Sequence, residues 1–195
     1  MTDHVFGYGS LAAPSGGELA ALGFRPSRAR RREGFVADVR GARRGWGVAM
    51  DNRVDLPGYK CYVDRDGRRP PVFVCFLDIE HAPGERVNGL CLPVTATELA
   101  ALDRRERNYE RTDVTCELEA APEPGTRVWA YRGSPAGRAR FAEGIAAGTA
   151  VVQAGYLEAV RAAFAALGEA EWEACAPSLD PRGLPVRALQ RRELA

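Results

Sequence analysis

The sequence predicts an α+β protein rather than a doubly wound α/β sheet. Its strand-like segments come first along the chain and its clearest helices come later, with few alternations of strand and helix. Apolar residues make up 46% of the 195 residues and charged residues 27%, which is typical of a globular protein with a proper core. We therefore expect a single domain over residues 1–195, with a longer polar excursion at residues 50–89 and an extended tail at residues 175–195.

The individual elements follow from periodicity and turn signals. Apolar runs bounded by Gly-, Pro- and Asp-rich stretches predict early strands at residues 4–8, 34–39, 46–50, 72–79 and 87–94. Thr95 and Glu98 form a capping box that begins a helix over residues 95–107. A strand pair is expected at residues 111–120 and 127–133. A second helix over residues 154–167 carries one apolar face, made of Leu157, Val160, Phe164 and Leu167.

Composition excludes several classes of protein. The 27 basic and 26 acidic residues leave a net charge of +1, which argues against a general nucleic-acid or membrane partner. The basic run at residues 28–33 is interpreted as a solvated face. The N-terminus lacks the features of a signal peptide, and no apolar run is long enough to span a bilayer. The five cysteines are scattered without a C-x-x-C motif, so we expect a reduced, cytoplasmic protein.

The histidines limit the possible chemistry. Only His4 and His81 are present, and neither has the neighbourhood of a Ser-His-Asp or Cys-His catalytic group. A histidine-rich metal site is excluded for the same reason. We expect chemistry that uses carboxylates, tyrosines and main-chain dipoles rather than a metal site.

The stretch "VFGYGSL" at residues 5–11 is the first candidate site. Gly7 and Gly9 permit positive φ angles and let a ligand approach the main chain closely. Successive N–H groups in such a turn form a nest that binds anions. The alternative is an ordinary strand end.

Glu106 is the second candidate. At 100° per residue it shares one stripe of the predicted helix with Leu99 and Leu102, whereas the three arginines around it point elsewhere. A carboxylate desolvated at a helix end has the properties that a general base working near neutral pH requires. A structural ion pair with a nearby arginine explains the same position equally well.

Two tyrosines near these segments remain open in the same way. Tyr109 lies at the junction of the predicted helix and the following strand, and Tyr156 begins the last predicted helix. Each could offer a hydroxyl to a polar substrate, and each could instead pack in the core or at the junction.

Three segments together resemble the γ-glutamylcyclotransferase family, including its aminoglycoside-biosynthesis and plant defence-associated branches. They are "FGYGSL", "VNGLCLPVTATELAALDRRERNYERTDV" and "VWAYRG", and the resemblance covers residues 5–167. It implies a mixed β-barrel flanked by helices. It also implies an enzyme of the acyltransferase or lyase class that needs no cofactor. Such an enzyme releases an amine or peptide from a small-molecule γ-glutamyl substrate and forms 5-oxoproline.

The resemblance also assigns roles to residues. It makes Glu106 the catalytic acid/base and the N-terminal turn the loop that holds the glutamyl group. The implied substrate-binding residues are Gly7, Tyr8, Gly9, Ser10, Leu11, Tyr109 and Tyr156. The excursion at residues 50–89 is longer and more charged than in compact members. We expect it to cover the pocket mouth and recognise the leaving amine through Asp51, Asn52, Arg53, Tyr59 and Lys60.

Two rival functions stay open. One is a non-catalytic small-molecule-binding module on the same barrel, whose pocket would lack a desolvated carboxylate. The other is a γ-glutamyl amidohydrolase with a cysteine nucleophile, which is disfavoured because no cysteine lies beside a histidine in the sequence.

Overall fold

A mixed sheet forms the centre of the computed structural model, which describes residues 2–12 and 34–194. Its strands run in the order β5-β6-β1-β4-β7-β8, with β2 paired to β4. They are β1 (Thr2–Gly7), β2 (Phe35–Asp51), β4 (Phe73–Val94), β5 (Tyr109–Asp113), β6 (Thr126–Gly133), β7 (Ala150–Gln153) and β8 (Val186–Arg187). Antiparallel pairs alternate with the parallel pairs β1–β6, β4–β7 and β7–β8. The predicted α+β class is confirmed. A closed barrel is not, because within the described part of the chain no pairing joins β5 to β8.

The hairpin of β2 and β4 is the longest feature of the sheet. It pairs Phe35 with Cys91 at one end and Asp51 with Phe73 at the other, with register shifts near residues 41 and 47. Four of the predicted short strands are therefore halves of two long ones. Bulges accommodate these register shifts without a break in the sheet, and one of them lies at Gly41, which has φ +67°.

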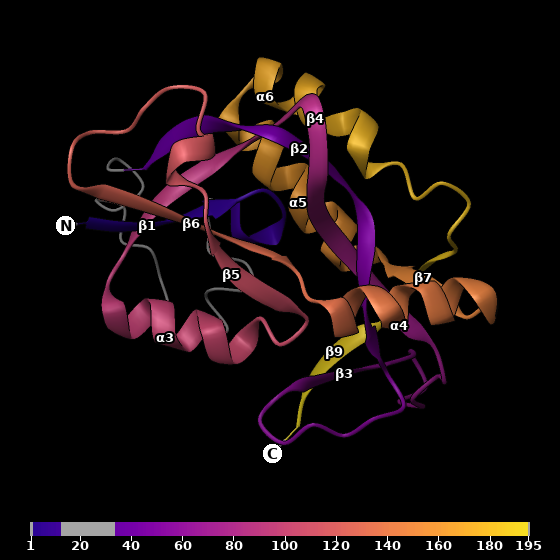
Figure 1. Ribbon diagram of the computed structural model, residues 1–195. Helices are drawn as coiled ribbons and strands as arrows, with labels where there is room; N and C mark the ends of the chain where they lie inside the picture. The colour runs from indigo at the N-terminus through magenta and orange to yellow at the C-terminus, as the bar shows by residue number, and fades with distance from the viewer. Residues whose placement is uncertain (1, 13–33, 195) are drawn as a thin grey trace.

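Within the described residues, four helices pack around the sheet (Figure 1). They are α3 (Ala96–Arg105), α4 (Pro135–Ala146), α5 (Ala154–Leu167) and α6 (Glu169–Cys175), with 3₁₀ turns η1 (Ser10–Ala12), η2 (Thr115–Glu117) and η3 (Ala176–Leu179). The capping box is confirmed, since Thr95 Oγ1 accepts from the Glu98 N–H and the Glu98 carboxylate accepts from the Thr95 N–H. The bounds of α5 match the prediction, and its predicted apolar face is buried at Leu157, Val160 and Phe164.

Several elements differ from the expectation. The helix predicted to end at residue 107 ends at Arg105, and the strand expected over residues 111–120 ends at Asp113. Helices α4 and α6 and strand β7 were not predicted. The tail over residues 175–195 contains η3, β8 and β9 (Gln190–Glu193).

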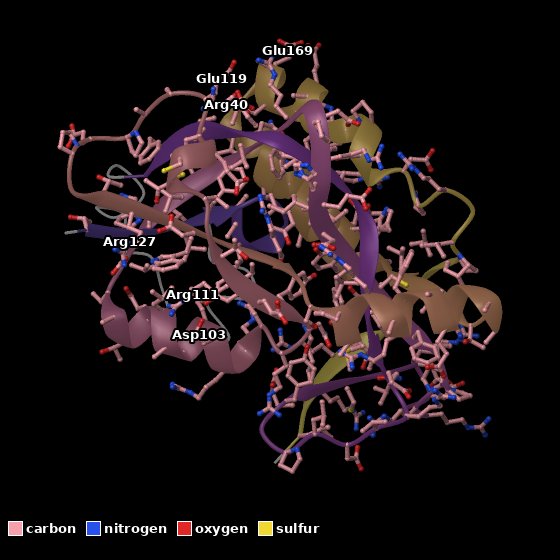
Figure 2. The ribbon with its side chains drawn as sticks, in the orientation of Figure 1. Arg40, Asp103, Arg111, Glu119, Arg127 and Glu169 are labelled. Atoms are coloured by element: carbon pink, nitrogen blue, oxygen red, sulfur yellow. The ribbon has the colours of Figure 1, made fainter. Side chains whose placement is uncertain are left out.

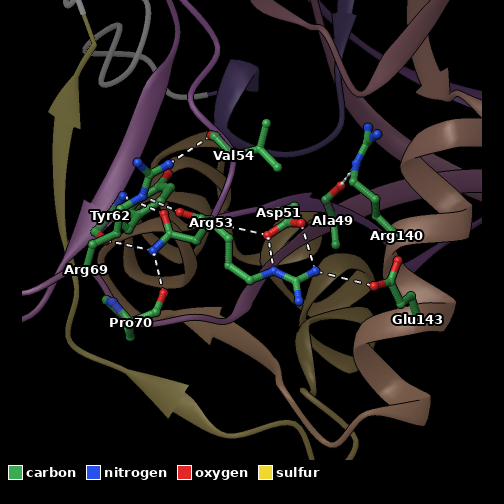
Figure 3. Close-up of polar contacts among 10 residues, drawn as sticks. Ala49, Asp51, Arg53, Val54, Tyr62, Arg69, Pro70, Arg140 and Glu143 are labelled. Atoms are coloured by element: carbon green, nitrogen blue, oxygen red, sulfur yellow. Dashed lines mark hydrogen bonds and ion pairs between the residues drawn. The ribbon is translucent and has the colours of Figure 1, made fainter.

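Strand β9 pairs with β3 (Lys60–Val63) in a small separate sheet, with Lys60 opposite Glu193. Figure 1 shows this pair at the lower end of the molecule, apart from the large sheet. The loops on either side of β3 are tied down by polar contacts (Figure 3). Arg53 pairs with Asp51 and reaches Glu143 on α4, and Arg69 donates to the Val54 carbonyl.

The buried apolar side chains of the described residues form two clusters. The larger one joins the long hairpin to α5 and to the turn after β1. The smaller one, made of Val5, Leu99, Leu102 and Tyr131, fixes α3 against β1 and β6. The basic run at residues 28–33 lies outside the described residues. Among the helices that are described, none is long and apolar enough to cross a membrane.

Candidate active site

A pocket lies where the turn after β1, the end of α3, strands β3, β4 and β6, and the start of α5 meet. The sequence-predicted residues that line it are Tyr8, Gly9, Ser10, Leu11, Glu106, Tyr109 and Tyr156. The lining residues that the prediction did not assign to the site, or placed only in the excursion over its mouth, are Tyr59, Lys60, Phe76, Leu77, Asn108 and Tyr131. Residues as far apart in the sequence as Tyr8 and Tyr156 thus line one pocket. Gly7 is the one predicted site residue that is not part of the lining.

The two glycines of the turn act differently from the expectation. Neither adopts a positive φ angle. A Cβ on Gly7 would lie 2.6 Å from the Ala12 nitrogen, so this glycine lets the turn fold back on β1. A Cβ on Gly9 would lie 3.1 Å from the Tyr156 hydroxyl. The missing side chains therefore provide space, and the Ala12 N–H closes the turn on the Gly9 carbonyl at 3.0 Å.

Glu106 is the C-cap of α3. Its N–H donates to the Leu102 carbonyl at 2.8 Å, and its own carbonyl accepts from the Tyr109 N–H at 2.9 Å. Its side chain is only 14% exposed and lines the pocket. The carboxylate Oε1 lies 3.6 Å from Nε of Arg105, whose side chain is 5% exposed. Both interpretations of the sequence are therefore present at once, a pocket carboxylate and an ion pair.

The position of Arg105 corrects one detail of the prediction. Helical spacing directed this arginine away from the buried stripe, whereas the structure buries it beside Glu106. Arg105 is the last residue of α3 and lies three residues after buried Leu102, so the two share the inward side of the helix, and Glu106 follows as the C-cap.

A cluster of tyrosines surrounds the main chain of Leu77 on β4. Tyr109 donates its hydroxyl hydrogen to the Leu77 carbonyl at 2.7 Å, and the Leu77 N–H donates to the Tyr156 hydroxyl at 3.3 Å. Tyr8 donates to the Tyr131 carbonyl. Burial raises the pKa of Tyr8 and of Tyr109 well above the ordinary value. These side chains stay protonated at neutral pH, so they position groups by hydrogen bonding and do not act as bases.

The Tyr131 side chain is fixed by a residue that does not line the pocket, Asp103. Burial and the Asp103 carboxylate raise its pKa, and its hydroxyl donates to Asp103 at 2.8 Å. Asp103 in turn pairs with Arg111 at 3.4 Å, and Figure 2 shows these two side chains facing each other from α3 and β5. The alternation of "VWAYRG" places Trp129 and Tyr131 on one strand face, and this signal could have identified Tyr131 from the sequence.

The polar excursion and Asn108 form a further part of the pocket wall. Asn108 Nδ2 donates to the Tyr59 hydroxyl at 3.1 Å, and Arg140 on α4 donates to Asn108 Oδ1 at 2.7 Å. Lys60 lies with Nζ 4.6 Å from the centre of the Phe76 ring. Tyr59 and Lys60 thus reach the pocket as expected of the excursion.

The other three excursion residues do not line the pocket. Asp51 and Arg53 pair with each other, and buried Asn52 bonds to the main chain of Tyr62 and Pro70. They fix the loops around β3, so the expectation that they contact a leaving group is wrong for this arrangement.

The cysteines lie away from this pocket. All five cysteines are free thiols, and none of them lines the pocket. Burial raises the pKa of Cys75 and of Cys91 to about 12. In the described ranges, no three His, Cys, Asp or Glu side chains lie close enough to hold a metal ion.

Known proteins resemble this chain weakly in individual structures and more clearly in one family model. No curated protein sequence matches the chain. A crystal structure of a human protein described as uncharacterized has 14% identity and a TM-score of 0.50, covering 100% of this chain and 94% of that one. A structure named γ-glutamyl cyclotransferase has 13% identity and a TM-score of 0.48, covering 96% and 90%. A solution structure from Arabidopsis thaliana has 21% identity and a TM-score of 0.41, covering 70% and 74%.

At these identities a structural likeness concerns the fold alone, and of these three structures the human one is similar enough to support it. The stronger finding is a family model, described as γ-glutamyl cyclotransferase, AIG2-like, which matches residues 5–148. That range includes the turn after β1, Lys60, Glu106, Asn108, Tyr109 and Tyr131. The chain belongs to the AIG2-like γ-glutamyl cyclotransferase family.

Proposed function

We propose that this protein is a γ-glutamyl cyclotransferase acting on a small-molecule γ-glutamyl substrate. The substrate's α-amine attacks its own γ-carbonyl carbon, the bond from that carbon to the leaving nitrogen breaks, and 5-oxoproline and a free amine are released. The observation that carries the proposal is the desolvated carboxylate of Glu106, which lines the same pocket as the main chain of Gly9 and Ser10. The free thiols agree with a reduced, cytoplasmic setting for this activity.

Glu106 has the position to move the proton. The α-ammonium must lose a proton before it attacks, and the leaving nitrogen must gain one before it departs. A single carboxylate can accept the first proton and donate it to the second nitrogen, because both nitrogens are bonded to the same carbon in the tetrahedral intermediate. The Arg105 guanidinium beside it favours the ionised form that begins the cycle.

The turn after β1 serves the other half of the reaction. In this proposal, main-chain N–H groups near Gly9 and Ser10 stabilise the oxygen that becomes negative, and each such donor is worth roughly 3–4 kcal/mol. Folding the glutamyl chain so that its amine lies near its own carbonyl contributes about 7–11 kcal/mol. The buried tyrosines shape the space in which this folded conformation fits.

The test is Glu106→Gln, which keeps the size of the side chain and removes its basicity. We expect 5-oxoproline release to fall by about 10²-fold or more, because general acid–base catalysis contributes about 10²–10⁴-fold. Glu110→Gln is the matched control, since Glu110 is an exposed carboxylate four residues later. A panel of γ-glutamyl peptides, γ-glutamyl amines and glutathione, assayed by mass spectrometry, gives the turnover of each variant.

Thermal unfolding of the same preparations separates catalysis from structure. If the Arg105–Glu106 pair is only structural, Glu106→Gln loses stability and keeps its turnover in the molecules that remain folded. Near-normal turnover in a well-folded Glu106→Gln protein contradicts the mechanism. A wild-type protein that binds γ-glutamyl compounds and releases no 5-oxoproline is a binding module instead.

A further inference from the structure

Lys60 is the only lysine in the chain, and it lies in the pocket. Of the 27 basic residues, the other 26 are arginine. Lys60 is 6% exposed, although most lysines are at the surface. Its Nζ lies 4.6 Å from the centre of the Phe76 ring and 5.6 Å from that of Tyr59. A chain that otherwise uses arginine thus has its one compact ammonium group at this site.

The surroundings of Lys60 favour a compact cationic side chain that contacts a bound ligand. An ammonium group is a compact point charge, whereas a guanidinium is a wide planar fork that needs more room. The faces of Phe76, Tyr59 and Tyr62 offset part of the cost of burying the charge. Among the described residues that line the pocket, Lys60 and Glu106 are the two that carry a full charge. This part of the pocket therefore contains one positive and one negative group.

The two charged groups belong to different parts of the fold. Glu106 and the turn after β1 are attached to the large sheet, where the glutamyl part of the substrate is expected. Lys60 is on β3 of the small sheet, in the polar excursion. Arg107 adds a second cation beside this wall, because its guanidinium lies over the Tyr59 ring and donates to the Pro57 carbonyl at 3.0 Å. This side of the pocket repels a cationic leaving group and attracts an anionic one.

We infer that Lys60 binds a carboxylate on the leaving group, so that the preferred substrates are γ-glutamyl amino acids and γ-glutamyl peptides rather than γ-glutamyl polyamines. This inference rests on the proposed function and adds the class of substrate to it. The glutamyl α-carboxylate is the other anion that Lys60 could bind, and the experiment separates the two.

The experiment compares γ-glutamyl-alanine with γ-glutamyl-ethylamide, which differs from it only by lacking the leaving-group carboxylate. In Lys60→Met, we expect kcat/KM for γ-glutamyl-alanine to fall about tenfold or more and that for γ-glutamyl-ethylamide to stay nearly unchanged. Arg65→Met is the matched control, because it removes one exposed positive charge from the same excursion. An equal fall in kcat/KM on both substrates assigns Lys60 to the α-carboxylate and overturns the inference. An unchanged kcat/KM on both substrates overturns it too.

Binding measurements keep this test separate from the test of catalysis. Calorimetry in the Glu106→Gln background gives the affinity for each compound without turnover, and Lys60→Met should remove the preference for γ-glutamyl-alanine. If the wild-type protein turns over neither compound, the proposed function fails, and this affinity ratio still decides the role of Lys60.

The single lysine provides a second readout should Lys60→Met not fold. Protein grown with ¹³C-labelled lysine gives one Cε signal, from Lys60 in the otherwise unaltered chain. That signal should shift when γ-glutamyl-alanine is added and stay in place with γ-glutamyl-ethylamide. Equal shifts, or none, contradict the inference.

Discussion

Gly9 shows how a single missing side chain can set the geometry of the pocket. The residue lies against the Tyr156 hydroxyl on one side and Leu77 on the other. The Tyr156 hydroxyl also accepts from the Leu77 N–H, so the turn, β4 and α5 meet at this atom. Because the φ angle of Gly9 is not positive, the backbone itself accepts an alanine. Glycine is needed at position 9 because a side chain there would crowd the Tyr156 hydroxyl.

We expect Gly9→Ala to reduce turnover more than stability. The new methyl group would lie 3.1 Å from the Tyr156 hydroxyl, so that hydroxyl must move by a few tenths of an ångström. A displacement of this size in a preorganised site should lower kcat/KM by roughly tenfold, since misplacement by 1 Å can cost about 10²-fold. Steady-state kinetics and thermal unfolding measure the two effects. Gly45→Ala is the control, because nothing lies within 4 Å of its added Cβ. Unchanged kinetics in Gly9→Ala show that the contact with Tyr156 does not shape the reacting geometry.

The residues of the site were predictable where the signal was local. Leu99 and Leu102 set the stripe that buries Glu106, and a helical period detects this. Lys60 and Asn108 enter the pocket because distant segments of the chain pair, and no local pattern records that. Arg105 follows buried Leu102 by three residues, so the same period allows its burial, but arginine is a residue type that is seldom buried.

At the scale of elements, α4 supports the pocket from behind. Its Arg140 holds the Asn108 side chain, and its N-cap residue Ser134 donates to the Asn108 carbonyl at 2.9 Å. The inward-facing positions of the helix are Gly137 and Gly144, both buried. These two glycines let the helix approach the main chain of Asn108 and the Phe73 side chain closely.

We expect Gly137→Ala to weaken both the fold and the site. Its methyl group would overlap the Asn108 carbonyl oxygen. Overpacking of this kind costs about 1–3 kcal/mol, against a gain in helix propensity of about 1 kcal/mol. Gly144→Ala is the matched variant in the same helix, because its methyl group meets Phe73, which does not line the pocket. Denaturant unfolding should show a loss in both variants, and turnover per folded molecule should fall only in Gly137→Ala. An equal fall in turnover in the two variants contradicts the role given to Asn108.

The same helix explains why part of the fold escaped prediction. Pattern reasoning finds helices by their apolar stripe, and in α4 the buried stripe contains glycines, which carry no apolar signal. Long-range pairing is the second cause, since nothing in "KCYV" indicates that its partner is "QRRE", near the other end of the chain. Helix α5 was predicted with correct bounds because its inward residues are large and apolar.

At the scale of the whole molecule, the interior keeps a set of weak acids protonated. Burial raises the pKa of Tyr8, Tyr109 and Tyr131, and raises that of Cys75 and Cys91 to about 12. In the unfolded chain the thiols ionise near pH 8.5 and the phenols near pH 10. Between the unfolded and folded pKa values, the folded state binds more protons than the unfolded state does. The free energy of unfolding must therefore decrease as pH rises through this range.

We expect these groups to leave the free energy of unfolding nearly constant below pH 8 and to lower it progressively above pH 8.5. Each group that titrates only in the unfolded state contributes a slope of about 1.4 kcal/mol per pH unit. Urea unfolding at several pH values with a reductant present measures the slope. Cys91→Ala should make it shallower between pH 9 and 10, and exposed Cys116→Ser should leave it as it is. A slope that does not change in Cys91→Ala shows that this thiol titrates alike in both states.

The pairing of β3 with β9 has a consequence for synthesis on the ribosome. Glu193 lies opposite Lys60, so the strand that carries the lysine gains its partner from residues 190–193. The turn after β1, the end of α3 and β6 are all complete in the nascent chain long before those residues leave the exit tunnel. The protein should therefore pass through a stage in which Glu106 and the turn are assembled while the lysine-bearing wall is still loose. The wall that is proposed to bind the leaving group should then form after the part of the pocket that holds the glutamyl group.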